Sequence, residues 1–322
     1  MKAILQDTYG PPDVLRLDDV DRPEPGDGEL LVRVRAAAVD PGVWHLMTGM
    51  PYAVRLFYGL RAPKVRVRGR DVAGHVEAVG RNVTRFRPGD EVFGVCEGSF
   101  AEYATLRQDR AAPKPANLTF EQAAALPVSG TTALRALRDE GRVRAGQWVL
   151  VIGAAGGIGT YAVQLARAFG ARVTGVCSTA KTGLVRSIGA DGVVDYTRED
   201  FADRPERYDL ILDTAGNRRL SHLRRALTPD GTLVLVGGEG GGRLTGGLER
   251  SLLAPLLSPF TRQRLRGLFT TEKDDDLRTL AEHAEAGELT PVIDRTYPLE
   301  RVPEAIRHLT ENHARGKVVI TV

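Results

Sequence analysis

Apolar and charged residues alternate in short stretches of roughly the first 120 residues, which is the pattern of half-buried β-strands. Glu29–Arg35 is the clearest stretch, and Val72–Val79 and Glu91–Val95 are predicted to be further strands. Arg87–Asp90 is predicted to form a turn, because proline and glycine adjoin in it. Arg110–Leu118 contains two prolines and is expected to be irregular. The N-terminal part of the chain is therefore expected to be rich in strands.

Strand and helix signals alternate from about Phe120 onward. Thr119, followed three residues later by Gln122, is typical of a capping box at the start of a helix. Five strands are predicted after it, at Val149–Ile152, Arg172–Cys177, Gly192–Asp195, Leu210–Asp213 and Thr232–Val236. Helical patterns lie between most of them, which indicates an α/β domain with a doubly wound parallel sheet.

The last part of the chain returns to strand character. Glu239–Gly247 is dense in glycine and is predicted to be a loop, whereas the mixed pattern of Leu252–Leu268 allows no assignment. A helix is predicted over Asp274–Ala286, and another begins at Val302 before a closing strand. The doubly wound domain is therefore expected to be inserted between two parts of a strand-rich domain. The predicted boundaries are 1–122, 123–264 and 265–322.

The composition fits a protein of about two domains, since 322 residues correspond to roughly 150 per domain. The 44 Lys and Arg residues against 41 Asp and Glu residues give a net charge of +3, which is too small to indicate a nucleic-acid or membrane-surface partner. No apolar run approaches the roughly 20 residues of a membrane helix, and the N-terminus has no signal-peptide core. Two cysteines cannot form a disulfide framework. We therefore expect a cytoplasmic, reduced and soluble protein.

A glycine-rich turn joins the first strand of the doubly wound domain to the helix that follows it. Gly153, Gly156 and Gly159 recur at three-residue intervals in this turn. Glycine lets the backbone approach a pyrophosphate, and a helix N-terminus supplies N–H groups and the positive end of its dipole. The turn therefore predicts a dinucleotide cofactor, although an ordinary strand–helix turn is the alternative. The residues predicted to bind the cofactor here are Gly156, Gly157, Ile158 and Gly159.

The segment after the next strand bears on the choice of cofactor. Sites selective for NAD usually carry an acid about 20 residues after the glycine turn, where it binds the ribose 2′-hydroxyl. Here the chain has Ser178, Thr179 and Lys181, and no acid stands at this place in the sequence. Hydroxyls and an ammonium group suit a 2′-phosphate, so NADPH is the predicted cofactor. The alternative is a loop that only contacts solvent.

Lys64–Arg70 is the densest basic run in the chain. Its alternation predicts a strand with the cations on one solvent-exposed face and the valines on the other. A phosphate-bearing substrate such as a coenzyme A thioester is the alternative partner of these cations. Aromatic residues do not interleave with them, which argues against RNA.

Several short motifs are each unspecific, but their order and spacing together are specific. They are Ala36–Pro41, Gly69–Asp71 with Gly74, Arg87–Gly94, Ser99–Tyr103, Pro113–Pro115, Ala123–Pro127, the glycine turn, Gly189–Asp191 with Asp195 and Tyr196, and Gly316–Val319. Through them nearly the whole chain resembles the medium-chain dehydrogenase/reductase family, in its zinc-free, quinone-oxidoreductase-like (zeta-crystallin-like) branch. The resemblance implies a GroES-like catalytic domain and a Rossmann domain with the active site between them. It also implies a homodimer formed through the nucleotide domain.

The resemblance implies that the protein binds no zinc. Zinc-dependent relatives carry a cysteine at the position of Asp40 and a His-Glu pair at Arg70 and Asp71, and an arginine cannot ligate a metal. Only Cys96 lies in the region of their structural cysteine lobe. Without a Lewis acid, hydride transfer from NADPH to a quinone or an α,β-unsaturated carbonyl is favoured over alcohol oxidation. The alternatives are an NAD(P)-dependent alcohol dehydrogenase and a weakly catalytic NADPH-binding sensor or structural protein.

The resemblance adds further cofactor contacts, and each has an ordinary alternative. They are Thr132, Tyr196, Gly237, Gly238 and Lys317. Tyr196 is expected near the adenosine phosphate and the two glycines along the nicotinamide side. The alternatives are a helix-capping hydroxyl for Thr132, a half-buried aromatic for Tyr196, a tight turn for the glycines and a basic residue starting an edge strand for Lys317.

Asp40, Trp44 and Tyr52 are the candidates for catalysis. The family usually has Asn where this chain has Asp40, and an Asp three residues later, where this chain has Val43. Asp40 is therefore either a proton donor or a loop substitution without a role. Tyr52 lies one residue from the place of a tyrosine proton donor in related enoyl-thioester reductases, and the alternative is an aromatic residue that lines the site. Trp44 and Phe57 are expected to shape its apolar wall.

Overall fold

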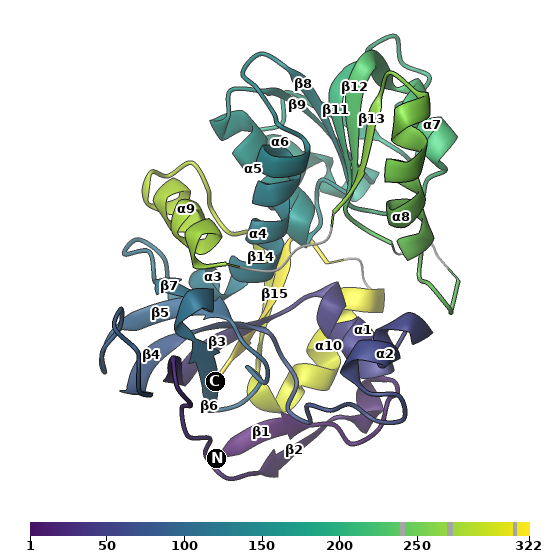
Figure 1. Ribbon diagram of the computed structural model, residues 1–322. Helices are drawn as coiled ribbons and strands as arrows, with labels where there is room; N and C mark the ends of the chain where they lie inside the picture. The colour runs from purple at the N-terminus through teal and green to yellow at the C-terminus, as the bar shows by residue number, and fades with distance from the viewer. Residues whose placement is uncertain (239–241, 269–272, 312–313) are drawn as a thin grey trace. The chain divides into compact units, whose positions relative to one another are not determined.

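The computed structural model describes residues 1–238, 242–268, 273–311 and 314–322, and the chain forms two units (Figure 1). Unit 1 consists of Met1–Thr131 and Thr271–Val322, and unit 2 consists of Thr132–Thr270. Unit 2 is therefore inserted, in sequence, between two parts of unit 1. The first residues of the predicted glycine-rich loop, 239–241, lie outside the described residues.

A seven-stranded, mainly antiparallel sheet forms unit 1, and its strand order is β14-β15-β3-β4-β5-β7, with β6 paired to β3. Its strands are β3 (Glu29–Val39), β4 (Asp71–Val79), β5 (Glu91–Val95), β6 (Tyr103–Arg107), β7 (Ala111–Pro113), β14 (Ile293–Pro298) and β15 (Lys317–Thr321). β14 and β15 are parallel, while the other pairs are antiparallel. A separate two-stranded sheet consists of β1 (Lys2–Leu5) and β2 (Arg16–Asp19).

The central strand β3 shows the predicted alternation and extends beyond it. Val32 and Val34 are buried while Arg33 and Arg35 are exposed. The strand continues to Val39 because small apolar residues pair there with β4 on one side and with β15 on the other. The prediction that Arg110–Leu118 is irregular was wrong for β7, which pairs with β5 at the edge of the sheet, where a proline is tolerated.

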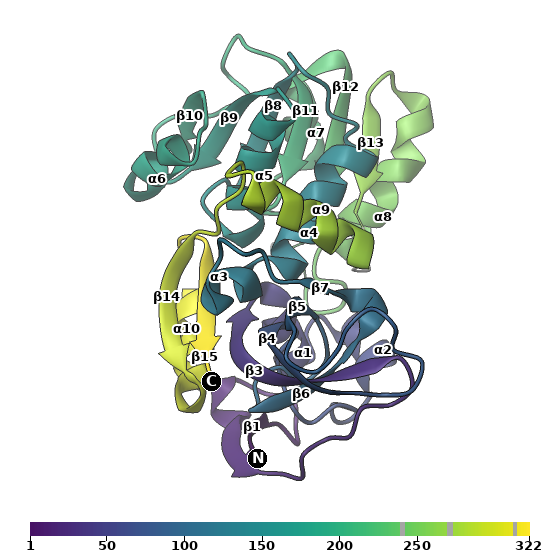
Figure 2. The same cartoon turned by 90° about the vertical axis from the view of Figure 1, so that its left-hand side faces the viewer.

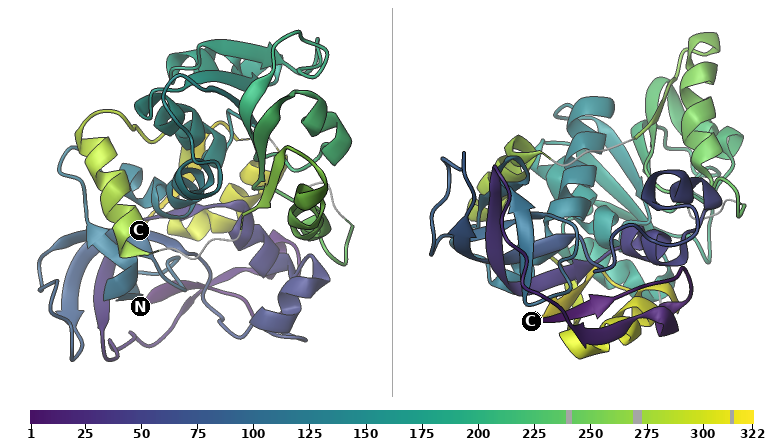
Figure 3. Two further views of the ribbon diagram at one scale, coloured as in Figure 1. Left: turned by 45° about the horizontal axis from the view of Figure 1, so that its top comes forward. Right: turned by 60° about the horizontal axis from the view of Figure 1, so that its bottom comes forward.

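Among the described residues, six α-helices belong wholly or partly to unit 1. They are α1 (Pro41–Thr48), α2 (Arg55–Tyr58), α3 (Phe120–Ala125), α4 (Pro127–Arg135), α9 (Asp274–Glu285) and α10 (Val302–Glu311). α1 and α10 pack on one another (Figure 3). Val43, Met47 and Ile306 are buried there with residues of β3 and β15. The capping box of α3 is confirmed, since Thr119 Oγ1 accepts the Gln122 N–H at 3.3 Å and Gln122 Oε1 accepts the Thr119 N–H at 3.0 Å.

Unit 2 is a six-stranded parallel sheet with the strand order β10-β9-β8-β11-β12-β13 (Figure 2). The strands are β8 (Trp148–Ile152), β9 (Arg172–Cys177), β10 (Gly192–Asp195), β11 (Tyr208–Asp213), β12 (Leu227–Leu235) and β13 (Arg264–Gly267). The helices are α5 (Gly157–Ala168), α6 (Thr182–Ser187), α7 (Leu220–Arg225) and α8 (Leu248–Leu257). Numbered from the first strand of this unit, the order is 3-2-1-4-5-6, the Rossmann order, in which β8 and β11 flank the topological switch point.

The division between the units differs from the predicted boundaries of 123 and 265 and lies at 132 and 271. α3 belongs to unit 1 because it packs on β3, β4 and β15. β13, most of which the sequence pattern placed in the C-terminal segment, pairs with β12 and completes the sheet of unit 2. None of the helices among the described residues is long and apolar enough to cross a membrane.

Candidate functional site

The glycine turn lies at the carboxyl end of β8, next to the switch point of the unit 2 sheet. Gly153 has φ +83°, and a Cβ on it would stand 2.5 Å from Thr214 Oγ1, just after β11. A Cβ on Gly159 would stand 2.1 Å from the Gly153 carbonyl oxygen. Side chains at these two positions would therefore collide with nearby atoms of the same chain, and this explains the two glycines independently of any ligand.

The N-terminus of α5 is open to a ligand. Gly156 is the N-cap and has no side chain, and no other side chain of the described residues caps the helix. The N–H groups of Gly157, Ile158 and Gly159 therefore point out of the first turn with the positive end of the helix dipole. A pyrophosphate at this place would accept from these groups, so the turn fits a dinucleotide.

The segment after β9 lies next to an acid that the sequence spacing did not reveal. Ser178 is half-buried and Thr179 is exposed. Thr179 Oγ1 donates to Asp195 Oδ2, at the end of the adjacent strand β10, at 2.5 Å and lies 2.9 Å from Thr197 Oγ1. The hydrogen bond from Thr179 helps to hold the pKa of Asp195 below its usual range, so the carboxyl is ionised at neutral pH. Lys181 follows on the same turn and is half-buried.

The ends of β10, β11 and β12 carry the other residues that we expected in unit 2. Tyr196 directly follows β10 and is 51% exposed, so its ring is not packed in the sheet. Gly237 follows β12, and a Cβ on it would lie 2.3 Å from the Thr214 carbonyl oxygen. Gly238 comes next, at the limit of the described segment. Thr132 is buried within α4 rather than before its first turn, so the alternative of a capping hydroxyl was wrong.

A buried ion pair at the end of β11 was not predicted. Asp213 is fully buried, and its Oδ2 accepts from Arg250 of α8 at 2.8 Å. Asp213 Oδ1 accepts the Gly216 N–H at 3.0 Å, and Arg250 also donates to the Gly216 carbonyl. The pair therefore fixes the loop that leaves β11 beside the glycine turn. No local motif predicts this ion pair, because the two charged residues are far apart in sequence.

In unit 1, Asp40 is the N-cap of α1. Its Oδ1 accepts the N–H groups of Gly42 at 2.7 Å and Val43 at 3.3 Å. The side chain is 3% exposed, and its Oδ2 has no hydrogen-bond partner among the described residues. The alternative of a loop substitution without a role was wrong, because Asp followed by Pro41 at the first helical position is a helix-start signal.

Trp44, Tyr52 and Phe57 lie on successive elements after Asp40. Trp44 is half-buried on α1, with its ring edge-on to His45 at 5.0 Å between centroids. Tyr52 is 44% exposed, and the Arg55 guanidinium lies 4.8 Å from the centre of its ring. Phe57, on α2, is 76% exposed. In the described part of the chain no hydrogen bond joins Asp40, Trp44 and Tyr52, so they do not form one polar cluster in unit 1.

Lys317 takes part in a buried polar network of unit 1. Its Nζ donates to Asp71 Oδ2 at 3.0 Å and to Ser129 Oγ at 3.1 Å, while Asp71 Oδ1 accepts the Val128 N–H at 2.8 Å. Burial raises the pKa of Asp71 to about 6, although Lys317 and the Val128 N–H act in the opposite direction. The alternative of a basic residue starting an edge strand was wrong, because β15 lies between β14 and β3. The role of Lys317 in binding a cofactor stays a prediction.

The prediction for Lys64–Arg70 holds only in part, since Lys64 and Arg66 are exposed as expected but Arg68 is buried and Arg70 half-buried. The segment forms no strand and makes only an isolated bridge between Val67 and Leu5. Arg68 is 6% exposed, its Nε has no hydrogen-bond partner, and its guanidinium forms no ion pair within the described residues. Burial lowers the pKa of Arg68 below its usual range. Burying a cation without a paired anion is destabilising, and Nε in particular has lost water without gaining a hydrogen-bond partner.

Arg68→Met is expected to raise the melting temperature by about 2–4 °C, because the buried charge that it removes destabilises the folded protein by about 1 kcal/mol. Thermal unfolding followed by circular dichroism measures the shift. Arg66→Met is the control, since Arg66 is exposed and paired with Asp7 at 2.7 Å, and we expect no significant change. A lower melting temperature for Arg68→Met alone would show that its guanidinium is stabilised in solution, and would contradict this prediction.

Among the described residues, no three His, Cys, Asp or Glu side chains are grouped so that they could hold a metal ion. Arg70, which the family resemblance places at the position of a histidine zinc ligand, is half-buried. Both cysteines, Cys96 and Cys177, are free and buried.

Two known domains match the chain. The alcohol dehydrogenase GroES-like domain matches residues 26–116, and the domain described as zinc-binding dehydrogenase matches residues 188–320. The first match lies within unit 1, and the second spans most of unit 2 and the C-terminal part of unit 1.

Relatives match over nearly the whole chain. The chloroplastic NADPH-dependent alkenal/one oxidoreductase of Arabidopsis thaliana is 35% identical, over 99% of this chain and 79% of its own length. The quinone oxidoreductase of Homo sapiens is 32% identical, over 99% of this chain and 97% of its own length. The solved structure of the Coxiella burnetii quinone oxidoreductase superimposes with a TM-score of 0.85 at 30% identity, over 100% and 99% of the two chains. A mycobacterial protein solved in complex with NADPH has a TM-score of 0.84 at 27% identity, over 100% of both chains.

Proposed function

The chain belongs to the medium-chain dehydrogenase/reductase family, and we propose that it is an NADPH-dependent reductase of quinones or α,β-unsaturated carbonyls that works without zinc. The observation that carries the proposal is the glycine turn, which opens the uncapped N-terminus of α5 at the switch point of a Rossmann sheet. Relatives that cover nearly the whole chain are named as NADPH-dependent alkenal/one and quinone oxidoreductases.

The residues of unit 2 fit the parts of NADPH in order. The pyrophosphate would accept from the first turn of α5, and the 2′-phosphate would meet Ser178, Thr179 and Lys181. Tyr196 is expected beside the adenosine and Gly237 and Gly238 along the nicotinamide side, with Thr132 as a further contact. When bound, NADPH supplies the hydride. The protein's part is to hold the cofactor and the acceptor in place and to keep water away.

The proposal that the protein works without zinc rests on the residues at the positions that the family resemblance gives to zinc ligands. A guanidinium cannot coordinate a metal, so Arg70 cannot replace a histidine ligand. Asp40 uses one carboxylate oxygen to cap α1. Chelator treatment is therefore expected to leave turnover unchanged.

The direct test is NADPH oxidation by the chelator-treated protein with a quinone, a 2-alkenal, an enoyl coenzyme A and a simple ketone. Turnover with the quinone or an enoyl compound is expected, and the preferred acceptor identifies the substrate class. Turnover with the ketone alone, lost on chelation, would instead indicate an alcohol dehydrogenase. NADPH binding without turnover of any acceptor would indicate a sensor or structural protein.

We propose Tyr52 as the proton donor to the reduced acceptor, since its phenol is solvent-accessible while Asp40 is tied to α1. Tyr52→Phe is expected to slow enone reduction by about 100-fold or more, with unchanged NADPH binding. Steady-state kinetics and a cofactor titration measure the two effects. Tyr58→Phe is the matched control, because Tyr58 lies on the adjoining α2 and is 43% exposed. Unchanged turnover in Tyr52→Phe would leave Tyr52 as a wall residue only.

We propose that the protein is a homodimer formed through unit 2. β13 is the last strand of its sheet, so its outer edge can pair with a second copy. α8 packs on β13 and leaves Leu252 60%, Leu253 52% and Leu256 65% exposed. Leu253→Glu with Leu256→Glu is expected to give monomers in light scattering, while wild type gives dimers. A monomeric wild type would contradict the proposal.

We also propose a cytoplasmic location. The two cysteines are buried free thiols, as is usual in a reducing compartment. Since one relative is named as chloroplastic and another as mitochondrial, cell fractionation is the test.

A further inference from the structure

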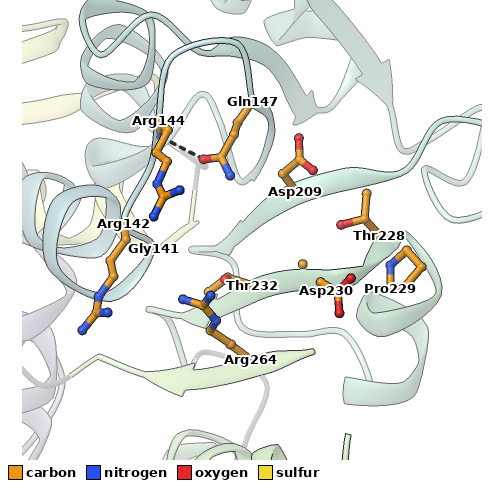
Figure 4. Close-up of a pocket in the computed structure, with 11 residues that line it drawn as sticks. Gly141, Arg142, Arg144, Gln147, Asp209, Thr228, Pro229, Asp230, Thr232 and Arg264 are labelled. Atoms are coloured by element: carbon orange, nitrogen blue, oxygen red, sulfur yellow. Dashed lines mark hydrogen bonds between the residues drawn. The ribbon is translucent and has the colours of Figure 1, made fainter. Parts of the chain in front are cut away.

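A cavity of about 380 Å³ lies at the amino ends of the unit 2 strands (Figure 4). Residues that precede or begin β8, β11, β12 and β13 line it, so it is at the opposite edge of the sheet from the glycine turn. Its volume is within the range of small-molecule sites. Its lining is polar rather than apolar, which favours a hydrophilic ligand. We call it the amino-edge pocket, defined here by Arg142, Arg144, Gln147, Asp209, Asp230 and Arg264.

The charges of the amino-edge pocket are unbalanced once their partners are considered. Arg142, Arg144 and Arg264 are exposed, and none of them forms an ion pair within the described residues. The two acids are already engaged. Asp209 Oδ2 accepts the Trp148 N–H at 2.9 Å, and the two oxygens of Asp230 accept from Nε and Nη2 of Arg262 at 3.0 Å each. Because Asp209 keeps its negative charge, the three arginines face one carboxylate without a cation partner in the described part of the chain, and the excess of positive charge favours an anionic ligand.

The backbone at Arg142 supports a site rather than a chance cluster. Arg142 has φ +49°, and apart from glycines only Asn82 shares a positive φ in the described residues. The preceding Gly141 is buried, and a Cβ on it would lie 2.8 Å from Leu210 Cδ2. An arginine held in this strained conformation is uncommon, and such outliers cluster at functional sites. Glycine would suit position 142 better if only the fold mattered.

We propose that the amino-edge pocket is a second ligand site, for a small polyanion that carries two or more phosphate or carboxylate groups. Guanidinium groups bind such groups through paired hydrogen bonds. Gln147 Oε1 accepts the Arg144 N–H at 2.8 Å, which leaves its amide N–H₂ as a further donor beside the arginines. The proposal does not depend on the proposed function, because it involves neither the glycine turn nor unit 1.

A purely structural role is the competing explanation. Arg142 and Arg144 follow the short helical segment Ala136–Glu140, and cations at a helix C-terminus stabilise its dipole. That role predicts that neutral replacements lower stability and that no anion binds. It does not account for Arg264, which lies on β13.

The test is calorimetric titration of the full chain with inorganic pyrophosphate and, separately, with citrate. Saturating NADPH is present throughout to occupy the cofactor site. One equivalent per chain is expected to bind, and the tighter of the two probes identifies phosphate or carboxylate as the preferred group. Arg142→Gly and Arg264→Gln are each expected to weaken binding at least tenfold. Arg219→Gln, an exposed arginine at the start of α7 in the same unit, is expected to bind as wild type does.

Arg142→Gly also separates the two explanations, because glycine relieves the positive φ. A melting temperature equal to or above that of wild type, together with weakened anion binding, supports the proposal. A lower melting temperature with no anion binding in wild type overturns it in favour of the helix-end role. Equal binding by wild type and by the Arg142→Gly, Arg264→Gln double variant overturns it as well. If NADPH itself fails to bind, the same titrations are done without it. The comparison of wild type with the arginine variants still shows whether the anion binds in the amino-edge pocket, since only these variants change that pocket.

Discussion

Lys317→Met is expected to lower the free energy of unfolding by about 3–5 kcal/mol, because it leaves the Asp71 carboxylate buried without its cation. Both side chains are almost fully buried, and they join β15 to β4 across 246 positions of sequence. The lysine also anchors Ser129, in the first turn of α4, where Asp71 accepts the Val128 N–H. Chemical denaturation at pH 7 measures the loss.

The double variant Asp71→Asn, Lys317→Met distinguishes the ion pair from simple packing. It removes both charges, so it is expected to recover most of the stability that Lys317→Met loses. Lys64→Met, at an exposed lysine, is expected to change stability by no more than about 0.5 kcal/mol. If the double variant is as unstable as Lys317→Met, the loss comes from the missing side-chain volume and not from an unpaired charge.

The raised pKa of Asp71, about 6, also predicts a pH dependence of stability. The carboxyl of Asp71 holds its proton more tightly in the folded protein than in the unfolded chain, where its pKa is near 3.8. Its contribution to the free energy of unfolding is therefore fully present below pH 3.8. It is lost as the pH rises through about 6. Unfolding measured from pH 4 to pH 7 in wild type and Asp71→Asn is therefore expected to show a loss with rising pH that the variant lacks. Parallel curves would contradict the assignment.

Lys181→Glu is expected to weaken NADPH binding about 100-fold, or about 2.8 kcal/mol, and NADH binding by no more than about threefold. The proposed reason is that only NADPH has a 2′-phosphate, which would lose a cation and face a new carboxylate. Titration of the protein's fluorescence with each cofactor measures both effects. Equal losses for the two cofactors would remove the assignment of this turn to the 2′-phosphate.

Two variants serve as controls for Lys181→Glu. Arg225→Glu makes the same change of charge on exposed α7 and is expected to alter neither affinity strongly. Asp195→Asn removes the carboxylate that contacts Thr179, so it is expected to strengthen NADPH binding more than NADH binding. A weaker affinity for NADPH in this variant would show that Asp195 supports the site instead, by orienting the Thr179 hydroxyl.

Local signals in the chain were enough for many elements. The bounds of β9 and β10 are those predicted, because runs of apolar residues between turn signals depend only on neighbours in sequence. The capping box at Thr119 and the helix α9 could also be predicted from local sequence, since the ends of a helix are determined by residues within one turn. The glycine turn could be recognised as well, as its strand, glycines and helix are contiguous.

Burial and long-range pairing were decided only by the tertiary structure. The alternation of Lys64–Arg70 predicted a solvent-exposed face, yet Arg68 is enclosed, because the segment runs beside β1 instead of forming a strand. Asp195 reaches Thr179 only because β10 lies next to β9, and Lys317 reaches Asp71 only because their strands join one sheet. The sequence by itself therefore determined many of the elements and the family. The order of strands determined which charges meet, since that depends on contacts between residues distant along the chain.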